Sequence, residues 1–412
     1  MSKRLKIILF SLFLIQMSVF AWIYWENVYQ VNQERLKYEL IFPDEFADPV
    51  SVYKLDLSNQ NLTTLPDCFK IFINTSDLNL SNNQLTNLPE WIQDFKKLEK
   101  INLSKNNFST FEVKIPVNKL DVLNLSYNQL SSINTEYLTD CYTLNLSNNS
   151  FEAFPDFDNQ HYLHHIILSH NNISFSEDER DIDIPMSSVD KLDLSHNNIS
   201  HLPKISTVSQ NSLDFIDFSH NPIEANDFEF GYKIKSISAR NSNQFKTQLM
   251  TAVSNGQLEK LQYLDLSDNN YAIEISDSNF YSNTNPGISF ELLAIQLNNL
   301  NSLKLSNINH NNGVNIRHKK LRYLTIETID KSIPIYLNCE RLYHLTVNRN
   351  SLDAILKGNS FLPNLRELKL EGKLYEAGEI INEIKLFKQK YPSVNIIGLD
   401  ATIEKEMVEE AF

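Results

Sequence analysis

Glycine is scarce in this chain: only 8 of its 412 residues are glycine, and the first of them is Gly231. Tight turns in the first half must therefore use another residue that tolerates a left-handed backbone, and the frequent asparagines suit that role best. Cysteine is also rare, with only Cys68, Cys141 and Cys339. Their spacing fits neither a zinc site nor a redox motif, so we expect three small buried core residues and no disulfide framework.

The chain also lacks the sequence signatures of catalysis. No glycine-rich phosphate loop, HExxH motif or GxSxG motif is present, so we expect no enzyme activity and no cofactor. An excess of basic residues is lacking as well, because the formal net charge is -14. An acidic surface repels phosphate backbones, which argues against nucleic acid as a partner. The hydrophobic fraction of 42% is sufficient for a core and excludes wholesale disorder.

A long apolar run covers residues 7–25 and follows three basic residues within the first six. A run of about 20 apolar residues crosses a bilayer as a helix. Basic residues before the run keep that end in the cytoplasm, and Trp22, Tyr24 and Trp25 lie where an aromatic belt is expected. The sequence predicts a cytoplasmic N-terminus at 1–6, a transmembrane signal anchor at 7–25, and the rest of the chain outside the cytoplasm.

A cleavable signal peptide is the alternative interpretation of the same run. Val19 and Ala21 could be the small residues before a cleavage site. The apolar run continues past Ala21 as Trp22-Ile23-Tyr24-Trp25, where a polar segment should be, and this favours the uncleaved anchor. After cleavage the mature protein would be secreted or periplasmic.

An eleven-residue phrase, LxxLxLxxNxL, recurs along the chain. Clear copies are residues 120–130 (LDVLNLSYNQL) and residues 189–199 (VDKLDLSHNNI). Aligned on the fourth position of the phrase, the copies fall at Leu55, Leu78, Ile101, Leu123, Leu144, Ile166, Leu192, Ile216, Ile237, Leu264, Leu303, Leu324, Leu345, Leu368 and Ile397.

Each position of the phrase has a physical role. Positions 4 and 6 alternate inward along a short strand, while positions 3, 5 and 7 face outward. The asparagine at position 9, where the strand ends, both donates and accepts, so it can satisfy loop backbone groups that would otherwise be buried unpaired. We expect these residues to stack as an asparagine ladder: Asn83, Asn106, Asn128, Asn149, Asn171, Asn197, Asn221, Asn269 and Asn350.

The pattern resembles the leucine-rich-repeat family, because the copies are mostly about 21–27 residues apart, within the family's range. In particular it resembles the short bacterial-type repeats, which have Leu-Pro after the asparagine loop, as at Leu65-Pro66, Leu88-Pro89 and Leu202-Pro203. The resemblance implies an α/β fold: a curved, right-handed solenoid of about 15 repeats over residues 52–400 with a parallel β-sheet on its concave face. It also implies that this face is used for protein recognition, although fold does not fix function.

The two ends of the array need caps, because a solenoid otherwise exposes its core. Residues 26–51 mix polar and apolar types and are expected to form a linker and an N-terminal cap. Helical periodicity over residues 375–391 and a strand over 394–399 precede a charged cap or tail at 401–412. The helix is expected to place Ile380, Ile381, Ile384 and Leu386 on one side.

The repeat is lost over about residues 271–290, where an Asn-Pro-Gly turn signal indicates an insertion loop. Long loops inside compact arrays are often functional. The alternative is a tolerated insertion without a function of its own.

Aromatic residues at position 3 of the later repeats indicate a candidate partner-binding surface. They are Phe215, Tyr263, Tyr323 and His344, and Lys191, Arg240 and Arg349 are expected near by on the same face. Aromatic residues and arginine are enriched in interface hot spots. The alternative is that the aromatics only support packing between neighbouring strands.

Three successive repeats carry histidine at position 8: His170, His196 and His220. Neighbouring strands lie about 4.8 Å apart, so the imidazoles are expected to form a column. Histidine binds zinc and titrates near neutrality, which makes these residues weak candidates for a metal site or a pH-sensitive surface. The favoured interpretation is a solvent-exposed position of an amplified repeat, with no metal.

The sequence therefore favours a membrane-anchored, non-catalytic protein that binds another protein through its concave face. A glycan- or surface-binding adhesin is an alternative, because small polar side chains fill positions 5 and 7 of the early repeats. The position-5 residues are Asp56, Asn79, Asn102, Asn124 and Asn145, each followed two residues later by serine. A structural or assembly factor of the cell envelope is the other alternative.

Overall fold

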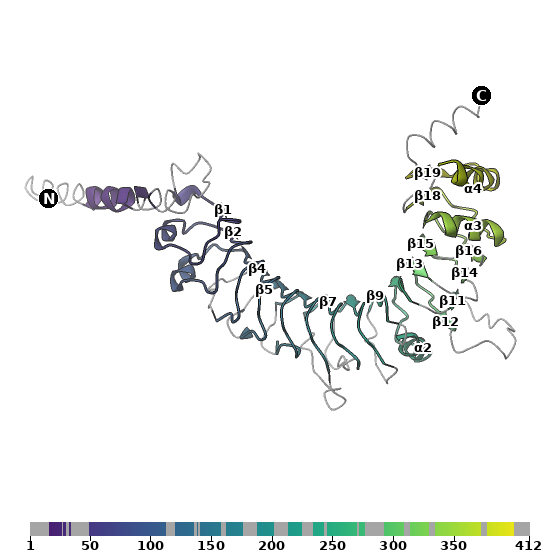
Figure 1. The fold of residues 1–412 in the computed structure, drawn as a ribbon, viewed down its shortest axis with the longest axis horizontal. Coiled ribbons are helices and arrows are strands. Elements are labelled where there is room, and N and C mark those ends of the chain that lie inside the picture. Colours follow the sequence, from purple (N-terminus) through teal and green to yellow (C-terminus); the bar gives the residue numbers. More distant parts are fainter. Residues whose placement is uncertain are drawn as a thin grey trace, which may run out of the picture. The chain divides into compact units, whose positions relative to one another are not determined.

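The computed structural model divides into two compact units, Met1–Leu168 and Ser169–Phe412. It describes residues 16–26, 28–29, 33, 49–112, 120–135, 138, 141–157, 162–175, 188–201, 213–224, 234–242, 245–269, 272–276, 292–308, 314–328, 334–371 and 377–398. Each unit stacks parallel strands, one after another along the chain (Figure 1).

Residues 16–26 are helical, and their apolar side chains are exposed. Trp22 and Trp25 are 63% and 61% exposed, and the Trp25 ring stacks on that of Tyr29 with 5.6 Å between centroids. Within the described residues, no helix is both long and apolar enough to cross a bilayer. The first part of the expected anchor, residues 7–15, and most of the expected cap at 26–51 lie outside the described residues.

The sheet of the first unit contains one strand from each turn. Its strands are β1 (Lys54–Asp56), β2 (Asp77–Asn79), β3 (Lys100–Asn102), β4 (Leu120–Asn124), β5 (Cys141–Asn145) and β6 (His165–Ile167). Position 4 of one turn lies opposite position 4 of the next, as Leu55 does opposite Leu78. Leu78 and Leu80 at positions 4 and 6 are buried, because alternate residues of a strand point to the same side.

Short 3₁₀ helices close the first turns on the side away from the sheet. They are η1 (Pro49–Ser51), η2 (Asp67–Ile71) and η3 (Glu90–Asp94). η2 and η3 follow Leu65-Pro66 and Leu88-Pro89, and the two prolines at their N-caps have φ of -60° and -68°. The proline ring holds φ near that value. Phe72 and Phe95, which end η2 and η3, are buried in the core.

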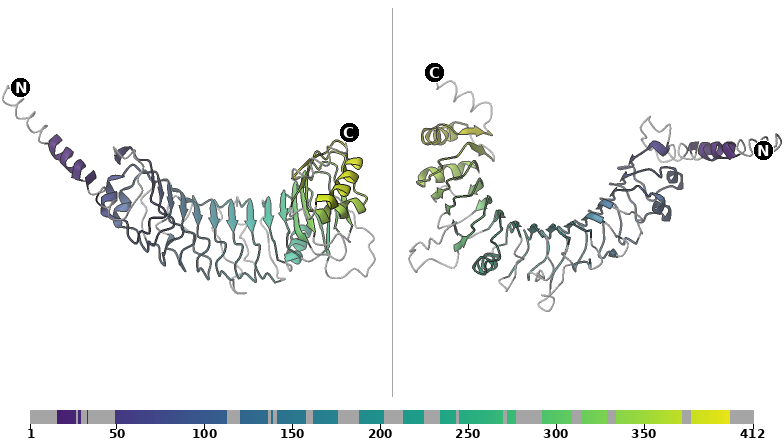
Figure 2. Two further views of the ribbon diagram at one scale, coloured as in Figure 1. Left: turned by 45° about the horizontal axis from the view of Figure 1, so that its top comes forward. Right: turned by 180° about the vertical axis from the view of Figure 1, so that it is seen from behind.

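The main sheet of the second unit runs in the order β7, β8, β9, β10, β13, β15, β17, β18, β19. Their bounds are β7 (Lys191–Asp193), β8 (Phe215–Asp217), β9 (Ser236–Ser238), β10 (Tyr263–Asp265), β13 (Ser302–Ile308), β15 (Tyr323–Thr328), β17 (His344–Val347), β18 (Glu367–Leu370) and β19 (Asn395–Ile397). A second parallel sheet has the order β12 (Leu292–Gln296), β11 (Ala272–Ser276), β14 (Val314–Arg317) and β16 (Ile335–Asn338). Figure 2 shows the strands of the main sheet running in one direction.

The regular part of the solenoid has about ten turns, which carry β1 to β10 in sequence order. This is fewer than the expected 15 repeats, because the later turns are built differently: they add strands of the second sheet or longer helices. The sequence predicted an insertion loop at about residues 271–290. This prediction is wrong at its start, because residues 272–276 form β11. Residues 277–291 lie outside the described residues. The last repeat copy is displaced by one residue, because Leu368 lies opposite Ile396 and not Ile397.

Among the described residues of the second unit, three α-helices pack on the side away from its main sheet (Figures 1 and 2). They are α2 (Phe245–Ser254), α3 (Arg349–Lys357) and α4 (Ala377–Lys390). In α4, Ile380, Ile381 and Ile384 are buried as expected, but Leu386 is 53% exposed. Phe387 takes its place in the core, because residues 380, 384 and 387 follow the spacing of a helix face and residue 386 does not.

Candidate binding surface

The asparagine ladder lies where the strands end and joins neighbouring turns. The Asn106 Oδ1 accepts a hydrogen bond from the Leu85 N–H at 3.0 Å. Its Nδ2 donates to the carbonyls of Leu80 and Leu103 at 2.9 and 3.0 Å. Asn83, Asn128, Asn149, Asn221 and Asn269 make the same three kinds of bond. Each asparagine thus satisfies backbone groups of two turns.

Two further members show part of the pattern. Asn197 accepts from the Ile173 N–H and donates to the Leu194 carbonyl, both at 3.0 Å. Asn171 donates to the carbonyl of Ser169 at 3.4 Å.

Asn350 departs from the pattern of the ladder, although its Nδ2 still donates to the Thr328 carbonyl of the preceding turn at 3.5 Å. Helix α3 begins at Arg349, so Asn350 lies in its first turn. Asn348 acts as the N-cap instead: its Oδ1 accepts from the Ser351 N–H, and its Nδ2 donates to the Thr328 carbonyl, both at 2.9 Å. The spacing rule chose the wrong one of two asparagines because a helix replaces the usual loop here.

Position 8 supplies the left-handed residue of each regular turn. Its φ lies between 47° and 60° at Asn59, Asn82, Lys105, Tyr127, Asn148, His170, His196, His220, Asn241 and Asp268. These residues form what we call the position-8 column. Asparagine, aspartate and histidine are enriched in this backbone region, and their presence explains how the chain bends without glycine.

The three histidines of the position-8 column stack face to face. Ring centroids are 4.0 Å apart for His170 and His196 and 4.1 Å apart for His196 and His220, with interplanar angles of 12° and 15°. Burial lowers the pKa of His196, and the neighbouring His220 and His170 lower it further. Among the described residues, no group of three or more His, Cys, Asp or Glu side chains could hold a metal ion.

The polar residues at positions 5 and 7 hold each other in place. The Ser81 N–H donates to Asn79 Oδ1 at 3.1 Å, and the Ser195 N–H donates to Asp193 Oδ1 at 3.0 Å. Such a bond from residue i+2 back to an Asn or Asp side chain stabilises a turn. The polar rows therefore have a structural role that sequence reasoning missed, although the repeated Asn/Asp-x-Ser spacing was the available signal.

Strand register brings the aromatic candidates of the second unit into one row, which we call the position-3 row. Its members on successive strands are Lys191, Phe215, Ser236, Tyr263, Ser302, Tyr323 and His344. Tyr323 is 48% exposed, and its ring lies 6.4 Å from that of His344. Phe215, Tyr263 and His344 are half-buried.

Carboxylates flank the middle of the position-3 row. Burial raises the pKa of Tyr263 to about 12, and the charges of Asp265 and Asp217 add to the effect. Burial also raises the pKa of Asp217, with a smaller contribution from Asp193, while hydrogen bonds from Ser219 oppose it. The centre of the row therefore combines aromatic rings with acidic groups at the next outward position.

The two arginines expected beside the row have different positions. Arg240 Nε and Nη2 donate to Asp268 Oδ2 at 3.0 and 2.6 Å. Although burial opposes its charge, the carboxylates of Asp268, Asp265 and Asp217 raise the pKa of Arg240. Arg349 lies in α3, and its Nη2 is 3.9 Å from Glu383 of α4. The expectation for Arg349 is therefore wrong, because it lies on the helical side and not beside the row.

The turns, their parallel strands and the asparagine ladder define a parallel β-solenoid. The family model described as "Leucine rich repeat" matches residues 50–108. Human lumican is 29% identical over 232 residues, which cover 54% of this chain and 62% of lumican, less than two thirds of its length. The chain thus contains leucine-rich repeats at residues 50–108 and is similar to leucine-rich-repeat proteins.

Solved structures of bacterial proteins are similar in fold. A leucine-rich-repeat protein of Leptospira interrogans has a TM-score of 0.47 and 18% identity, covering 85% of this chain and 96% of that chain. An internalin of Listeria monocytogenes has a TM-score of 0.45 and 14% identity, covering 85% and 88%. YopM from Yersinia enterocolitica has a TM-score of 0.42 and 18% identity, covering 79% and 67%.

Proposed function

We propose that this protein is a non-catalytic, membrane-anchored binding protein that recognises a protein partner through the main sheet of its second unit. Leucine-rich-repeat domains commonly bind proteins. The observation that carries the proposal is the position-3 row, in which register aligns Phe215, Tyr263, Tyr323 and His344 on one outward face.

The chemistry of the row suits a protein interface. Partly exposed aromatic rings provide large contact areas with few rotatable bonds, and such residues dominate interface hot spots. Tyr323 exposes nearly half of its surface although it lies within a strand of the main sheet. The small Ser236 and Ser302 between the aromatics leave room for side chains of a partner.

A triple variant tests the row. We expect Phe215→Ala/Tyr263→Ala/Tyr323→Ala to lose a partner that the wild-type chain retains during affinity purification from the native membrane, identified by mass spectrometry. The matched control is Tyr127→Ala/Tyr142→Ala, which removes two exposed tyrosines of the first unit. The single change Tyr323→Arg, at a side chain that is 48% exposed, is a second test in case the triple variant folds poorly. Unchanged partner recovery by both folded variants would rule the row out.

We propose that residues 7–25 anchor the protein and that the repeats lie outside the cytoplasm. The basic N-terminal residues and the exposed apolar side chains of residues 16–26 support this arrangement. Removal of residues 7–25 is expected to release the protein from membranes washed at alkaline pH, while the full chain stays bound. A mature mass lower by about twenty residues would show signal-peptide cleavage instead.

A further inference from the structure

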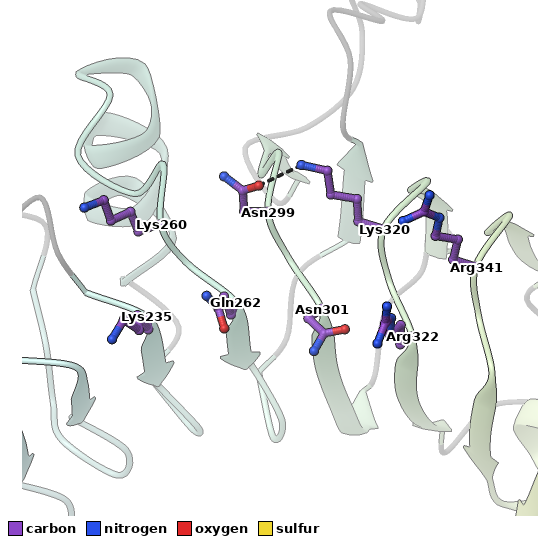
Figure 3. A pocket seen from close by; sticks show the side chains of 8 residues that line it. All are labelled: Lys235, Lys260, Gln262, Asn299, Asn301, Lys320, Arg322 and Arg341. Atoms are coloured by element: carbon purple, nitrogen blue, oxygen red, sulfur yellow. Dashed lines mark hydrogen bonds between the residues drawn. The ribbon is translucent and has the colours of Figure 1, made fainter.

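A hollow of about 350 Å³ lies in the second unit, at the edge of the main sheet where the strands begin (Figure 3). We call it the basic hollow. Two rows of residues line it. Four residues each directly precede a strand, three more lie two residues before one of these four, and Arg341 lies at the corresponding place before β17.

The first row consists of Lys235 before β9, Gln262 before β10, Asn301 before β13 and Arg322 before β15. Backbone hydrogen bonds join its members. The Gln262 N–H donates to the Lys235 carbonyl at 2.8 Å, the Asn301 N–H to Gln262 at 2.8 Å, and the Arg322 N–H to Asn301 at 2.9 Å. The side chains therefore follow one another at about the strand spacing of 4.8 Å.

The second row consists of Lys260, Asn299, Lys320 and Arg341. Both rows line the same hollow, and Figure 3 shows the second row farther from the strands. Lys320 Nζ donates to Asn299 Oδ1 at 2.8 Å, and Asn299 Nδ2 donates to the Glu259 carbonyl at 2.6 Å. Asn299 is thereby held in place and orients the lysine.

The lining is cationic although the chain as a whole is acidic. Five basic and three amide side chains line the hollow without a carboxylate, whereas the whole chain has a net charge of -14. Lys235 donates to Asp214 Oδ2 at 2.8 Å. Lys260, Arg322 and Arg341 make no side-chain hydrogen bond or ion pair with any other described residue. Like charges gathered in this way repel one another, and a bound anion would offset that repulsion.

We propose that the basic hollow binds a phosphorylated or sulfated sugar unit. The guanidinium groups of Arg322 and Arg341 match the oxygens of a phosphate or sulfate ester, which arginine binds through two parallel hydrogen bonds. The side-chain amides of Gln262 and Asn301 make no hydrogen bond with another described residue. An amide both donates and accepts, which suits the hydroxyl groups of a sugar.

The size of the hollow agrees with such a ligand. Small-molecule sites usually measure about 300–1,000 Å³, and a hollow of about 350 Å³ accepts one monosaccharide with its ester group. A bare oxyanion would leave the amides unused. This site goes beyond the proposed protein-binding face, because its residues precede the strands, whereas the position-3 row lies on them.

Calorimetric titration of the full chain, purified in a polyoxyethylene detergent at low salt, tests the proposal. The probes are glucose 6-phosphate, glucose 6-sulfate, glucose and inorganic phosphate. We expect at least one sugar ester to bind saturably and at least tenfold more tightly than glucose or inorganic phosphate. Tighter binding of glucose 6-phosphate or of glucose 6-sulfate shows whether the natural ligand carries a phosphate or a sulfate ester. Failure of both esters to bind the wild-type chain would overturn the proposal.

Matched variants locate the binding. Arg322→Gln/Arg341→Gln and Lys260→Gln/Lys320→Gln should each weaken ester binding at least tenfold. The control Lys54→Gln/Lys100→Gln removes the same charge from exposed positions of the first unit and should leave binding unchanged. An equal loss in the control would mean non-specific attraction, and inorganic phosphate binding as tightly as the ester would remove the sugar from the proposal. Either result contradicts the assignment.

Discussion

Two neighbouring positions shape the bend of each regular turn, and they depend on different properties of the side chain. Position 9 needs an amide, because Oδ1 and Nδ2 must accept and donate at once, as in Asn106. Position 8 needs only tolerance of a positive φ, so Lys105, Tyr127 and three histidines can occupy it. The exposed position 8 is therefore free to vary, while position 9 is chemically restricted.

Replacement of a ladder asparagine should cost substantial stability. Asn106→Ala leaves the Leu85 N–H without its partner. The Leu80 and Leu103 carbonyls each lose one donor and keep Asn83 and Asn128. An unsatisfied buried group costs about 1–3 kcal/mol and a lost hydrogen bond about 1 kcal/mol, so we expect the free energy of unfolding to fall by about 3 kcal/mol in denaturant titration. The control is Asn107→Ala, at an exposed side chain, with an expected change within about 0.5 kcal/mol. Similar losses in both variants would contradict the ladder's role.

The stacked histidines should make stability depend on pH. Burial and the two neighbouring imidazoles lower the pKa of His196 from its usual 6.5. As the pH falls through about 6.5, the unfolded chain takes up a proton that the folded chain resists, so stability is lost. His196→Asn keeps a residue suited to positive φ, and its melting temperature should fall less between pH 7.5 and pH 5. His164→Asn is the control, and equal pH profiles for wild type and His196→Asn would refute the effect.

At the scale of elements, α3 shows how a helix is fitted into a repeat. Asn348 caps its first turn, and Gly358 ends it beside β16. A Cβ atom at Gly358 would lie 1.9 Å from the carbonyl oxygen of Ile335. No side chain fits at that distance, so the contact between α3 and the second sheet requires glycine, although φ at Gly358 is an ordinary -77°.

Gly358→Ala should therefore destabilise the protein by about 3 kcal/mol, since backbone must move to relieve the overlap. Gly256→Asn is the matched control. Gly256 has φ of 72°, which asparagine tolerates, and the nearest atom to an added Cβ is 3.8 Å away. We expect the control to change the unfolding free energy by less than about 1 kcal/mol in the same titration. A loss as large in the control would refute the close-approach argument.

At the scale of the whole molecule, stability rests on packing and hydrogen bonds without covalent cross-links. Cys68, Cys141 and Cys339 form no disulfide, and all three are buried. Burial raises the pKa of Cys141 to about 12. The thiolate is the reactive form of cysteine, so a buried thiol of this kind is inert in the folded state.

The reactivity of the three thiols therefore reports whether the two units are folded. We expect Ellman's reagent to modify none of the three within minutes at pH 8 in the native protein and all three in denaturant. Reducing agent should leave the melting temperature unchanged. Rapid reaction of any thiol in the folded protein would contradict the burial, and a melting temperature lowered by reductant would contradict the absence of disulfides.

The sequence by itself determined the features that repeat locally. The period of two placed Leu78 and Leu80 inward. The spacing of the copies located the strands of the two main sheets up to β18, because burial of leucine and amide pairing by asparagine act within each turn. The helix at α4 was also predictable from its periodicity, apart from the exchange of Leu386 for Phe387.

Only the tertiary structure decided what neighbouring turns create together. The stacking of the later turns creates the second sheet. It also makes Asn348 the N-cap of α3 and places Arg349 beside Glu383 of α4, away from the position-3 row. The basic hollow is the clearest case. Its residues recur before successive strands of the main sheet, as in Lys320-Leu321-Arg322. They are polar and do not contribute to the hydrophobic periodicity that predicts the strands. They become a site because register places separate turns side by side, and electrostatic interactions act through space and not along the chain.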